Sequence, residues 1–262
     1  MTEPRCLVLR LAGPLQSWGL TSRHNRRATA GEPTKSGVVG LLAASQGRRR
    51  TDPIEDLAAL VLGVRIDQPG QLRRDYHTVS SLDGRPLPSA MVSGKGQQRG
   101  TSPAKHTHVT ERFYLEEAVF VAAVHGPGAL LEALETALRS PAFPLALGRR
   151  SCVPTQPLVL AAPDGGLHPG APLDVLAQVP WQAGPTARKR MRANGELSDT
   201  VSLPVAIDDP AGDELRQDAP VSFDPKGRRF TSRRVAQRWV VVDSGLPKGS
   251  AVRHDPFALL GW

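Results

Sequence analysis

The sequence predicts an α+β protein with a ferredoxin-like core followed by a smaller β-rich part. Residues 5–152 have the pattern strand, helix, strand or strands, strand, helix and strand, which is the split βαβ order. A stretch at about 80–108 has almost no apolar periodicity and interrupts this order before the third strand. After about residue 154, strand patterns dominate. We therefore expect a core over residues 1–154 with an insertion at about 80–108, and a β-rich part over residues 155–262.

The first strand and the first helices have local signals. The segment RCLVLRLAG (residues 5–13) is short and mostly apolar, which favours a strand. Thr34 is a suitable N-cap for a helix from residue 35 to about 46, because apolar residues repeat there at i, i+3 and i+4. Residues 51–63 predict a second, short helix, which an aspartate can cap and a glycine can end.

The rest of the core alternates between the two patterns. Residues 64–68 and 72–80 are candidate strands. Residues 116–126 form a near-continuous apolar run, which is typical of a strand buried on both faces. Residues 127–140 predict a helix with a proline near its start and leucines along one side. Residues 143–152, FPLALGRRSC, predict the last strand of the core.

The C-terminal part contains fewer clear elements. Residues 173–181 predict a short helix, and residues 200–208 and 234–243 predict strands. Residues 182–196 are basic, and we expect them to be mobile.

The charge of the chain predicts an anionic partner, most simply a nucleic acid. The net charge is +8 and the pI is near 10.2. Aromatic residues make up only 5% of the chain, which argues against base stacking as the main interaction with a nucleic acid. The basic residues, mostly arginines, gather in Gly/Pro-rich segments that suit a groove for phosphates. These segments are RHNRR (23–27), GRRR (47–50), LRRDYH (72–77), KGQQR (95–99), AKH (104–106), GRRSC (148–152), ARKRMR (187–192) and KGRRFTSRR (226–234).

Other classes of protein are not favoured. No apolar run is long enough for a membrane helix, and the N-terminus has no clear secretion signal, so we expect a cytoplasmic protein. Cys6 and Cys152 have no metal-ligand spacing, and we expect two buried, reduced thiols. His106 and His108 can share one face of a strand but have no evident third ligand. We therefore expect no metal and no cofactor.

The segment PTKSGVVGLLAAS (33–45) places a lysine and a serine at the start of the first predicted helix. It lacks the glycines of a nucleotide-binding loop, so an ATP or GTP site is not favoured. A helix N-terminus still offers free N–H groups and partial positive charge to a phosphate. The alternative is an ordinary capped helix with a solvated lysine.

Several segments, taken in order, resemble the CasD family, the CRISPR-associated subunits of the type I-E Cascade surveillance complex. The resemblance implies a ferredoxin-like (RRM-type) core, an inserted β-hairpin thumb and a smaller C-terminal β part. It also implies a non-catalytic subunit that binds the 5′ handle of the CRISPR RNA, caps the backbone filament in antiviral defence, and contacts the backbone and large subunits. The segments are LVLRLAGPLQSWG, PTKSGVVGLLAAS, ERFYLEEAVFVAAVHG, LGRRSCVPTQP and FTSRRV.

The resemblance also implies a set of RNA-binding residues. Some match family motifs directly, some match mainly by charge, and some fall on the predicted thumb or its base. A further group, Arg228, Arg229, Arg233 and Arg234, is expected to face the large subunit or target DNA instead. The direct matches are Trp18, Lys35, Ser36, Arg149 and Arg150; the looser matches are Arg26 and Arg27; the thumb residues are Lys95, Arg99, Lys105 and His106.

Two other functions remain open from the sequence. A related family, the type I-C processing subunit, cleaves repeat RNA without metal, using tyrosine, lysine and histidine side chains. Lys105 and His106, with Tyr76 or Tyr114, are the residues here that resemble that arrangement. A generic nucleic-acid-binding module would explain the charge, but not the ordered set of motifs.

Overall fold

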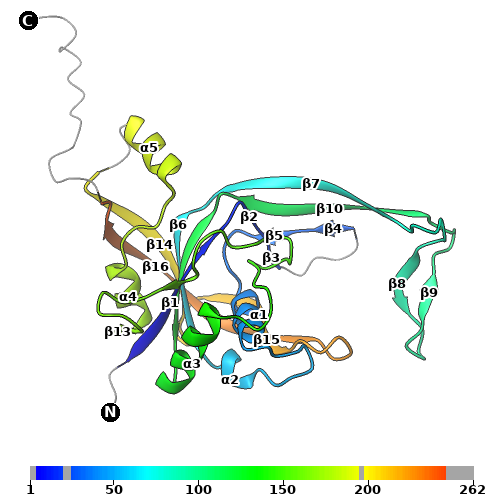
Figure 1. The fold of residues 1–262 in the computed structure, drawn as a ribbon, viewed down its shortest axis with the longest axis horizontal. Helices are drawn as coiled ribbons and strands as arrows, with labels where there is room; N and C mark the ends of the chain where they lie inside the picture. Colours follow the sequence, from blue (N-terminus) through cyan, green and yellow to red (C-terminus); the bar gives the residue numbers. More distant parts are fainter. Residues whose placement is uncertain (1–3, 20–24, 195–197, 246–262) are drawn as a thin grey trace, which may run out of the picture.

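The computed structural model describes residues 4–19, 25–194 and 198–245 as a mixed α/β fold built on one long sheet (Figure 1). Strands far apart in the sequence lie side by side in the order β12-β1-β11-β6-β14-β16-β15, with β13 also paired to β1. All of these pairings are antiparallel. The strands are β1 (Arg5–Ala12), β6 (Val61–Gln68), β11 (Val119–His125), β12 (Val159–Leu160), β13 (His168–Pro169), β14 (Thr200–Asp208), β15 (Glu214–Ser222) and β16 (Arg229–Asp243).

The central strands of this sheet are covered on both faces, and the alternation of β1 shows how. Leu7, Leu9 and Leu11 belong to a core packed with residues of α1 (Lys35–Ser45), α2 (Glu55–Ala58) and α3 (Gly128–Arg139). Cys6 and Val8 point the other way, into a second core that includes α4 (Pro172–Gln178). Successive strand residues face opposite sides, so a strand covered on both faces is mostly apolar, as β1 is from Cys6 to Ala12 apart from Arg10. At the β15–β16 edge one face is open, because Trp239 and Val241 are exposed.

An arm projects from the sheet toward the right of Figure 1. It is formed by β7 (Gln71–Ser80) and β10 (Thr107–Glu116), which pair antiparallel along their whole lengths. A small hairpin of β8 (Pro88–Val92) and β9 (Gln98–Gly100) lies at its far end. The insertion expected at about 80–108 is thus the outer part of a longer projection, residues 71–116, which we call the arm.

Short strands surround the inner end of the arm. β2 (Leu15–Gln16) and β4 (Arg26–Arg27) each pair with β10. Beside them, β3 (Trp18–Gly19) pairs with β5 (Thr29–Ala30).

Two predictions for the core were wrong. The helix expected over residues 51–63 is only the four-residue α2, because the apolar end of this segment belongs to β6. Within β6, Gly63 packs closely on α4: a Cβ added at Gly63 would be 3.0 Å from Leu176. Residues 143–152 are turns around Gly148, which has φ +87°, and the short β12 takes the place beside β1. A short apolar run fits a helix or a strand equally well, so its partners decide.

The C-terminal part also departs from the expectation. Residues 182–196 were expected to be mobile, but their described portion contains the helix α5 (Pro185–Ala193). The polar strand β15 was not predicted, whereas β14 has the expected bounds and β16 is longer than expected. Because β14 pairs with β6, the described strands on both sides of residue 154 share one sheet. The division into two parts at this position stays a prediction.

Candidate nucleic-acid interface

The motif PLQSWG contains the short strands β2 and β3 and lies beside the inner end of the arm. The side-chain amide of Gln16 donates to the carbonyls of Leu11 (3.0 Å) and Ala118 (2.7 Å), and its oxygen accepts from Trp18 Nε1 (3.1 Å). Trp18 is 0% exposed and lies on α1, where a Cβ at Gly37 would be 2.6 Å from the indole ring. The ring offers no surface to an RNA base, so Trp18 has a packing role in this structure.

The second motif, LGRRSC, lies directly against the first, with a parallel bridge between Ser17 and Gly148. Ser17 donates its N–H to Leu147 O at 3.1 Å and its hydroxyl to Phe113 O at 3.1 Å. A Cβ at Gly148 would lie 1.9 Å from Ser17 O, and φ at this glycine is +87°. Only glycine allows both the positive φ and this approach. The two motifs are therefore parts of a single junction.

Arg149 connects this junction to the arm. Its guanidinium donates to Phe113 O on β10 (3.2 Å) and to Arg27 O on β4 (2.7 Å), and it lies 4.9 Å from the ring centroid of Tyr114. These contacts engage both terminal nitrogens of the guanidinium. Arg149 therefore acts as a brace between two strands, while its neighbour Arg150 is exposed.

Two arginines lie opposite each other where the arm meets the sheet. Strands β4 and β10 pair in parallel with Arg27 opposite Arg112, so both side chains point to the same face of the small sheet that these strands form. Neither guanidinium lies within 4 Å of a carboxylate in the described part of the chain, although Asp75 of β7 is the residue opposite Arg112. Arg112 Nε donates to Thr110 Oγ1 at 3.3 Å. Arg26 leaves the other face and lies 5.0 Å from the ring centroid of Phe113. We call Arg27, Arg112, Arg149 and Arg150 the arm root.

Neighbouring arginines of the arm are neutralised. Arg73 donates to Glu116 at 2.7 Å, and Arg74 lies 3.6 Å from Glu111. The arm root is therefore a local excess of positive charge beside a balanced stretch of the same strands. Arg112 was not among the predicted site residues. The family-like segment ERFYLEEAVFVAAVHG contains Arg112, but its position opposite Arg27 follows only from the register of β4 against β10.

At the start of α1 the structure places carboxylates where the sequence suggested a phosphate. Thr34 caps the helix as predicted, accepting from Gly37 N at 3.2 Å. The N–H of Lys35 donates to Asp218 Oδ2 at 2.8 Å, and its ammonium donates to Asp208 Oδ2 at 2.7 Å. Binding of RNA by Lys35 and Ser36 stays a prediction, but it would require these two carboxylates to give way.

A third cation completes this group. Arg233 donates to both oxygens of Asp218, at 2.7 and 2.9 Å, and also to Asp208. The four side chains are 10–13% exposed. We call Lys35, Asp208, Asp218 and Arg233 the charge clamp. Arg233 was expected to face the large subunit or DNA, but the clamp holds it inside the protein.

The charge clamp shifts the pKa of two of its members, Asp218 and Arg233. Burial alone would raise the pKa of Asp218, but the hydrogen bonds and charge of Arg233 outweigh it and lower that pKa below its usual value. Burial would lower the pKa of Arg233, whereas its bonds to Asp218 raise that pKa further. The ion pair between Asp218 and Arg233 therefore stays charged at neutral pH.

The predicted residues of the outer arm are exposed. Lys95, Arg99 and Lys105 have exposed side chains, and Nδ1 of His106 lies 3.0 Å from Gly84 O. The tyrosines considered as catalytic partners of His106 are remote from it. Tyr114 lies about 23 Å along β10 from its first residue, and Tyr76, opposite Glu111, about 13 Å.

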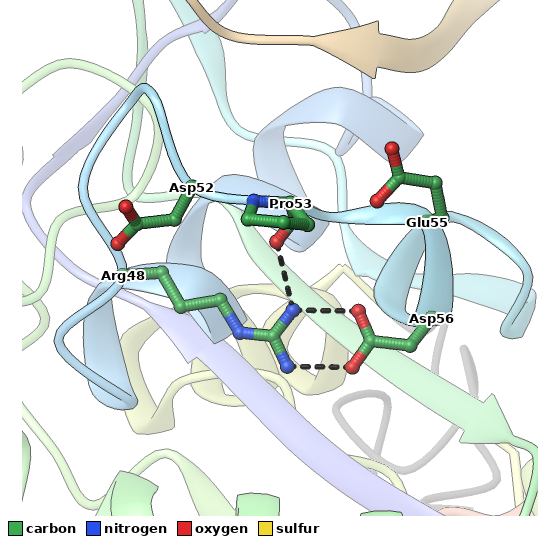
Figure 2. A pocket seen from close by; sticks show the side chains of 5 residues that line it. All are labelled: Arg48, Asp52, Pro53, Glu55 and Asp56. Atoms are coloured by element: carbon green, nitrogen blue, oxygen red, sulfur yellow. Dashed lines mark hydrogen bonds and ion pairs between the residues drawn. The ribbon is translucent and has the colours of Figure 1, made fainter.

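A pocket elsewhere on the surface does not suit an anion. Figure 2 shows Arg48 forming two parallel hydrogen bonds, each 2.5 Å, to Asp56, with two more carboxylates on the pocket wall. The described residues contain no group of three metal-ligating side chains. No helix in the described ranges is long and apolar enough to cross a membrane. Cys6 and Cys152 are buried free thiols, and burial raises the pKa of Cys6 to about 12.

Comparisons with known proteins give the class of this chain. Residues 6–236 match the family described as CRISPR-associated protein (Cas_Cas5), which makes this a CRISPR-associated protein. The CRISPR system Cascade subunit CasD of Escherichia coli (strain K12) is 36% identical over 172 residues, which are 59% of this chain and 69% of CasD. The chain therefore belongs to the Cas5 (CasD) family, and the resemblance seen in the sequence is confirmed.

Solved structures agree with this assignment. A chain of a CRISPR RNA-guided surveillance complex superposes with a TM-score of 0.67 and 32% identity, covering 91% of both chains. A structure described as a Cas protein superposes with a TM-score of 0.64 and 35% identity, covering 92% of this chain and 100% of the other.

Proposed function

We propose that this protein is a non-catalytic subunit of a CRISPR Cascade surveillance complex that binds the 5′ handle of the CRISPR RNA at the arm root. In this proposal it also caps the backbone filament and contacts the backbone and large subunits, in antiviral defence. The observation that carries the RNA-binding step is the unpaired Arg27–Arg112 pair on neighbouring strands.

Two like charges directly opposite each other on paired strands destabilise a sheet. No described carboxylate forms an ion pair with Arg27 or Arg112, whereas Glu111 and Glu116 pair with other arginines of the same arm. Asp75, opposite Arg112 on β7, offsets only part of this charge. A phosphate between the two guanidiniums would remove the repulsion and accept charge-assisted hydrogen bonds from both. Exposed Arg150 beside them extends the same positive surface. An RNA backbone is therefore the ligand that suits this site.

The fold and the relatives support the same proposal. The antiparallel order β12-β1-β11-β6, with α1 after β1 and α3 after β11, is the order of a ferredoxin-like (RRM-type) core. The arm would then be the thumb of the family. Membership in Cascade is inferred from the E. coli relative, which is a Cascade subunit, and from the surveillance-complex chain that superposes on this one.

In this proposal the matched motif residues have two different roles. Arg27, Arg112 and Arg150 contact RNA, while Arg149 positions Arg27 through its backbone carbonyl. Trp18 and the glycine at 148 hold the junction on which the arm root is built.

The absence of catalysis is also part of the proposal. A metal-independent cut would need His106 close to a second acid–base group. Both candidate tyrosines lie on the arm at distances that no side chain spans, which supports RNA contact as the role of His106. Incubation with repeat RNA and no divalent metal should leave the RNA intact on a denaturing gel. A discrete cut that His106→Ala abolishes would establish the processing endoribonuclease instead.

The handle-binding proposal is tested by paired variants of one arm. Arg27→Ala/Arg112→Ala should weaken binding of labelled handle RNA and lower the slope of log K against log salt by about 1.4, the value for two single-strand phosphate contacts. The matched control Arg73→Ala/Arg74→Ala removes the same charge from ion-paired arginines and should change the slope by less than half as much. Equal slopes in the two variants would refute the arm-root assignment.

A further inference from the structure

The basic segment ARKRMR forms a second positive surface, away from the arm root. It lies in α5, which carries four basic residues and no acidic one. Figure 1 shows α5 on the opposite side of the sheet from the end of the arm. The proposed handle site therefore does not account for this surface.

The first of these basic residues fixes the helix to the core. The guanidinium of Arg188 donates to the carbonyls of Trp181, Ala183 and Ser244. It also lies 4.9 Å from the ring centroid of Trp181, which is 3% exposed. Met191, one turn further along, packs on the same core. The helix is therefore held on one side and presents the other side to solvent.

The three remaining basic residues of α5 form no ion pair within the described part of the chain. Lys189, Arg190 and Arg192 are exposed, and none forms a side-chain hydrogen bond or ion pair with a described residue. Lys189 and Arg192 are three positions apart, so they share a face and repel each other. This contrasts with exposed arginines such as Arg139 and Arg238, which lie beside Glu135 and Asp209.

We propose that α5 binds the phosphate backbone of a DNA duplex, as a second nucleic-acid site separate from the arm root. A single strand is usually gripped by aromatic stacking as well as charge, but α5 exposes no aromatic residue, and Arg188 covers Trp181. A protein partner usually needs a central apolar or aromatic anchor, but Met191 is turned to the core. A duplex presents its phosphates outward, which matches exposed cations on a helix that is anchored to the core.

The test uses the full chain with excess unlabelled handle RNA, so that the duplex does not compete for the arm root. Binding of a short labelled DNA duplex is measured over a series of salt concentrations. Lys189→Ala/Arg190→Ala/Arg192→Ala should weaken duplex binding by roughly tenfold or more and lower the salt slope by about 2 to 3. Alanine preserves helix propensity, and an unchanged thermal melt would confirm that α5 is intact.

The matched control is Arg5→Ala/Arg139→Ala/Arg238→Ala. It removes the same charge from residues that lie beside carboxylates. Duplex binding by this variant should stay within about twofold of the parent. The same loss in both variants would overturn the proposal, because net charge alone would then explain it. An α5 variant that binds the duplex normally but no longer assembles with partner subunits would also overturn it, in favour of a protein interface.

This inference does not depend on the handle site. Handle RNA affinity of the α5 variant should stay within about twofold of the parent. If Arg27→Ala/Arg112→Ala leaves handle binding intact, the proposed function fails while the duplex test still stands. If the α5 variant loses handle and duplex binding together, the two sites are one, and the inference fails.

Discussion

The arm root and the charge clamp contain the same kinds of residue in opposite electrostatic situations. In the charge clamp, two cations share two carboxylates at distances near 2.7 Å, and the side chains are 10–13% exposed. In the arm root, Arg27 and Arg112 face each other and neither forms an ion pair with a described carboxylate, although Asp75 lies opposite Arg112 on β7. The first arrangement is complete without a ligand, whereas the second is relieved by an anion.

This difference separates cations that hold the fold from cations that are free to bind. The lysine of the motif PTKSG is engaged in the clamp, which joins α1 to β14, β15 and β16. The first arginine of the motif LGRRSC is a brace, and its neighbour is exposed. A matched motif therefore indicates the family, while the neighbours of each residue indicate its role.

The largest effect is expected where the clamp is opened. Asp208→Ala leaves Lys35 and Arg233 without this carboxylate and removes the acceptor of Leu62 N–H. Breaking a buried ion pair by removing one partner costs about 3 kcal/mol or more. Urea unfolding should show this loss, whereas Arg238→Ala, which breaks an exposed pair, should cost less than about 1 kcal/mol. Equal losses would mean that the clamp is no more than a surface ion pair.

The next effect concerns the support of the arm root. Gly148→Ala places a Cβ 1.9 Å from Ser17 O at a residue with φ +87°. The left-handed conformation alone costs an alanine about 1 to 2 kcal/mol, and the clash adds to it. We expect a loss of about 2 kcal/mol or more in urea unfolding, together with weaker handle binding, since Arg149 follows directly. Gly128→Ala, with nothing within 4 Å of the added Cβ, is the control and should change neither quantity. Retained stability at 148 would show that the junction adapts.

A smaller effect should appear in acid. The pKa of Asp218 is lower in the folded protein than its unfolded value of about 3.9. Its contribution to stability is therefore complete above that value and is lost as the pH falls through the folded pKa. Asp218→Asn should lower stability at neutral pH and flatten the acid limb of stability against pH. An acid limb with unchanged slope would show that Asp218 does not carry this linkage.

The sequence predicts the local elements of this protein better than its contacts. The strand at 116–126 and the helices at 35–46 and 127–140 were close to the observed elements, because their apolar periodicity determines them locally. The strand expected at 143–152 was wrong, since the pairing beside β1 depends on residues much further along the chain.

The candidate site shows the same division. Charge and motif order indicated arginines at 26–27 and 149–150, and both pairs lie where the arm meets the sheet. No local pattern indicated that Arg112 would lie opposite Arg27, because that contact depends on strand register. Nor did any local pattern indicate that Asp208 and Asp218 would reach Lys35, which is more than 170 positions away from them. Such long-range pairs are fixed by sheet topology, which periodicity does not encode.

The smallest effect is the sharpest test of the comparison itself. Lys35→Gln removes a cation from the clamp but none from the arm root. If the clamp is structural, handle RNA affinity should change by less than about twofold. Stability at neutral pH should fall, because Asp208 loses one of its two cationic partners. Arg27→Ala should give the reverse result, with weaker RNA binding and little change in stability.

A tenfold loss of handle affinity in Lys35→Gln, without a change in the urea midpoint, would mean that an RNA phosphate displaces Asp218 from the start of α1. The N-terminus of α1 would then be the RNA-binding site that the sequence suggested. The distinction between structural cations and RNA-binding cations would fail at Lys35.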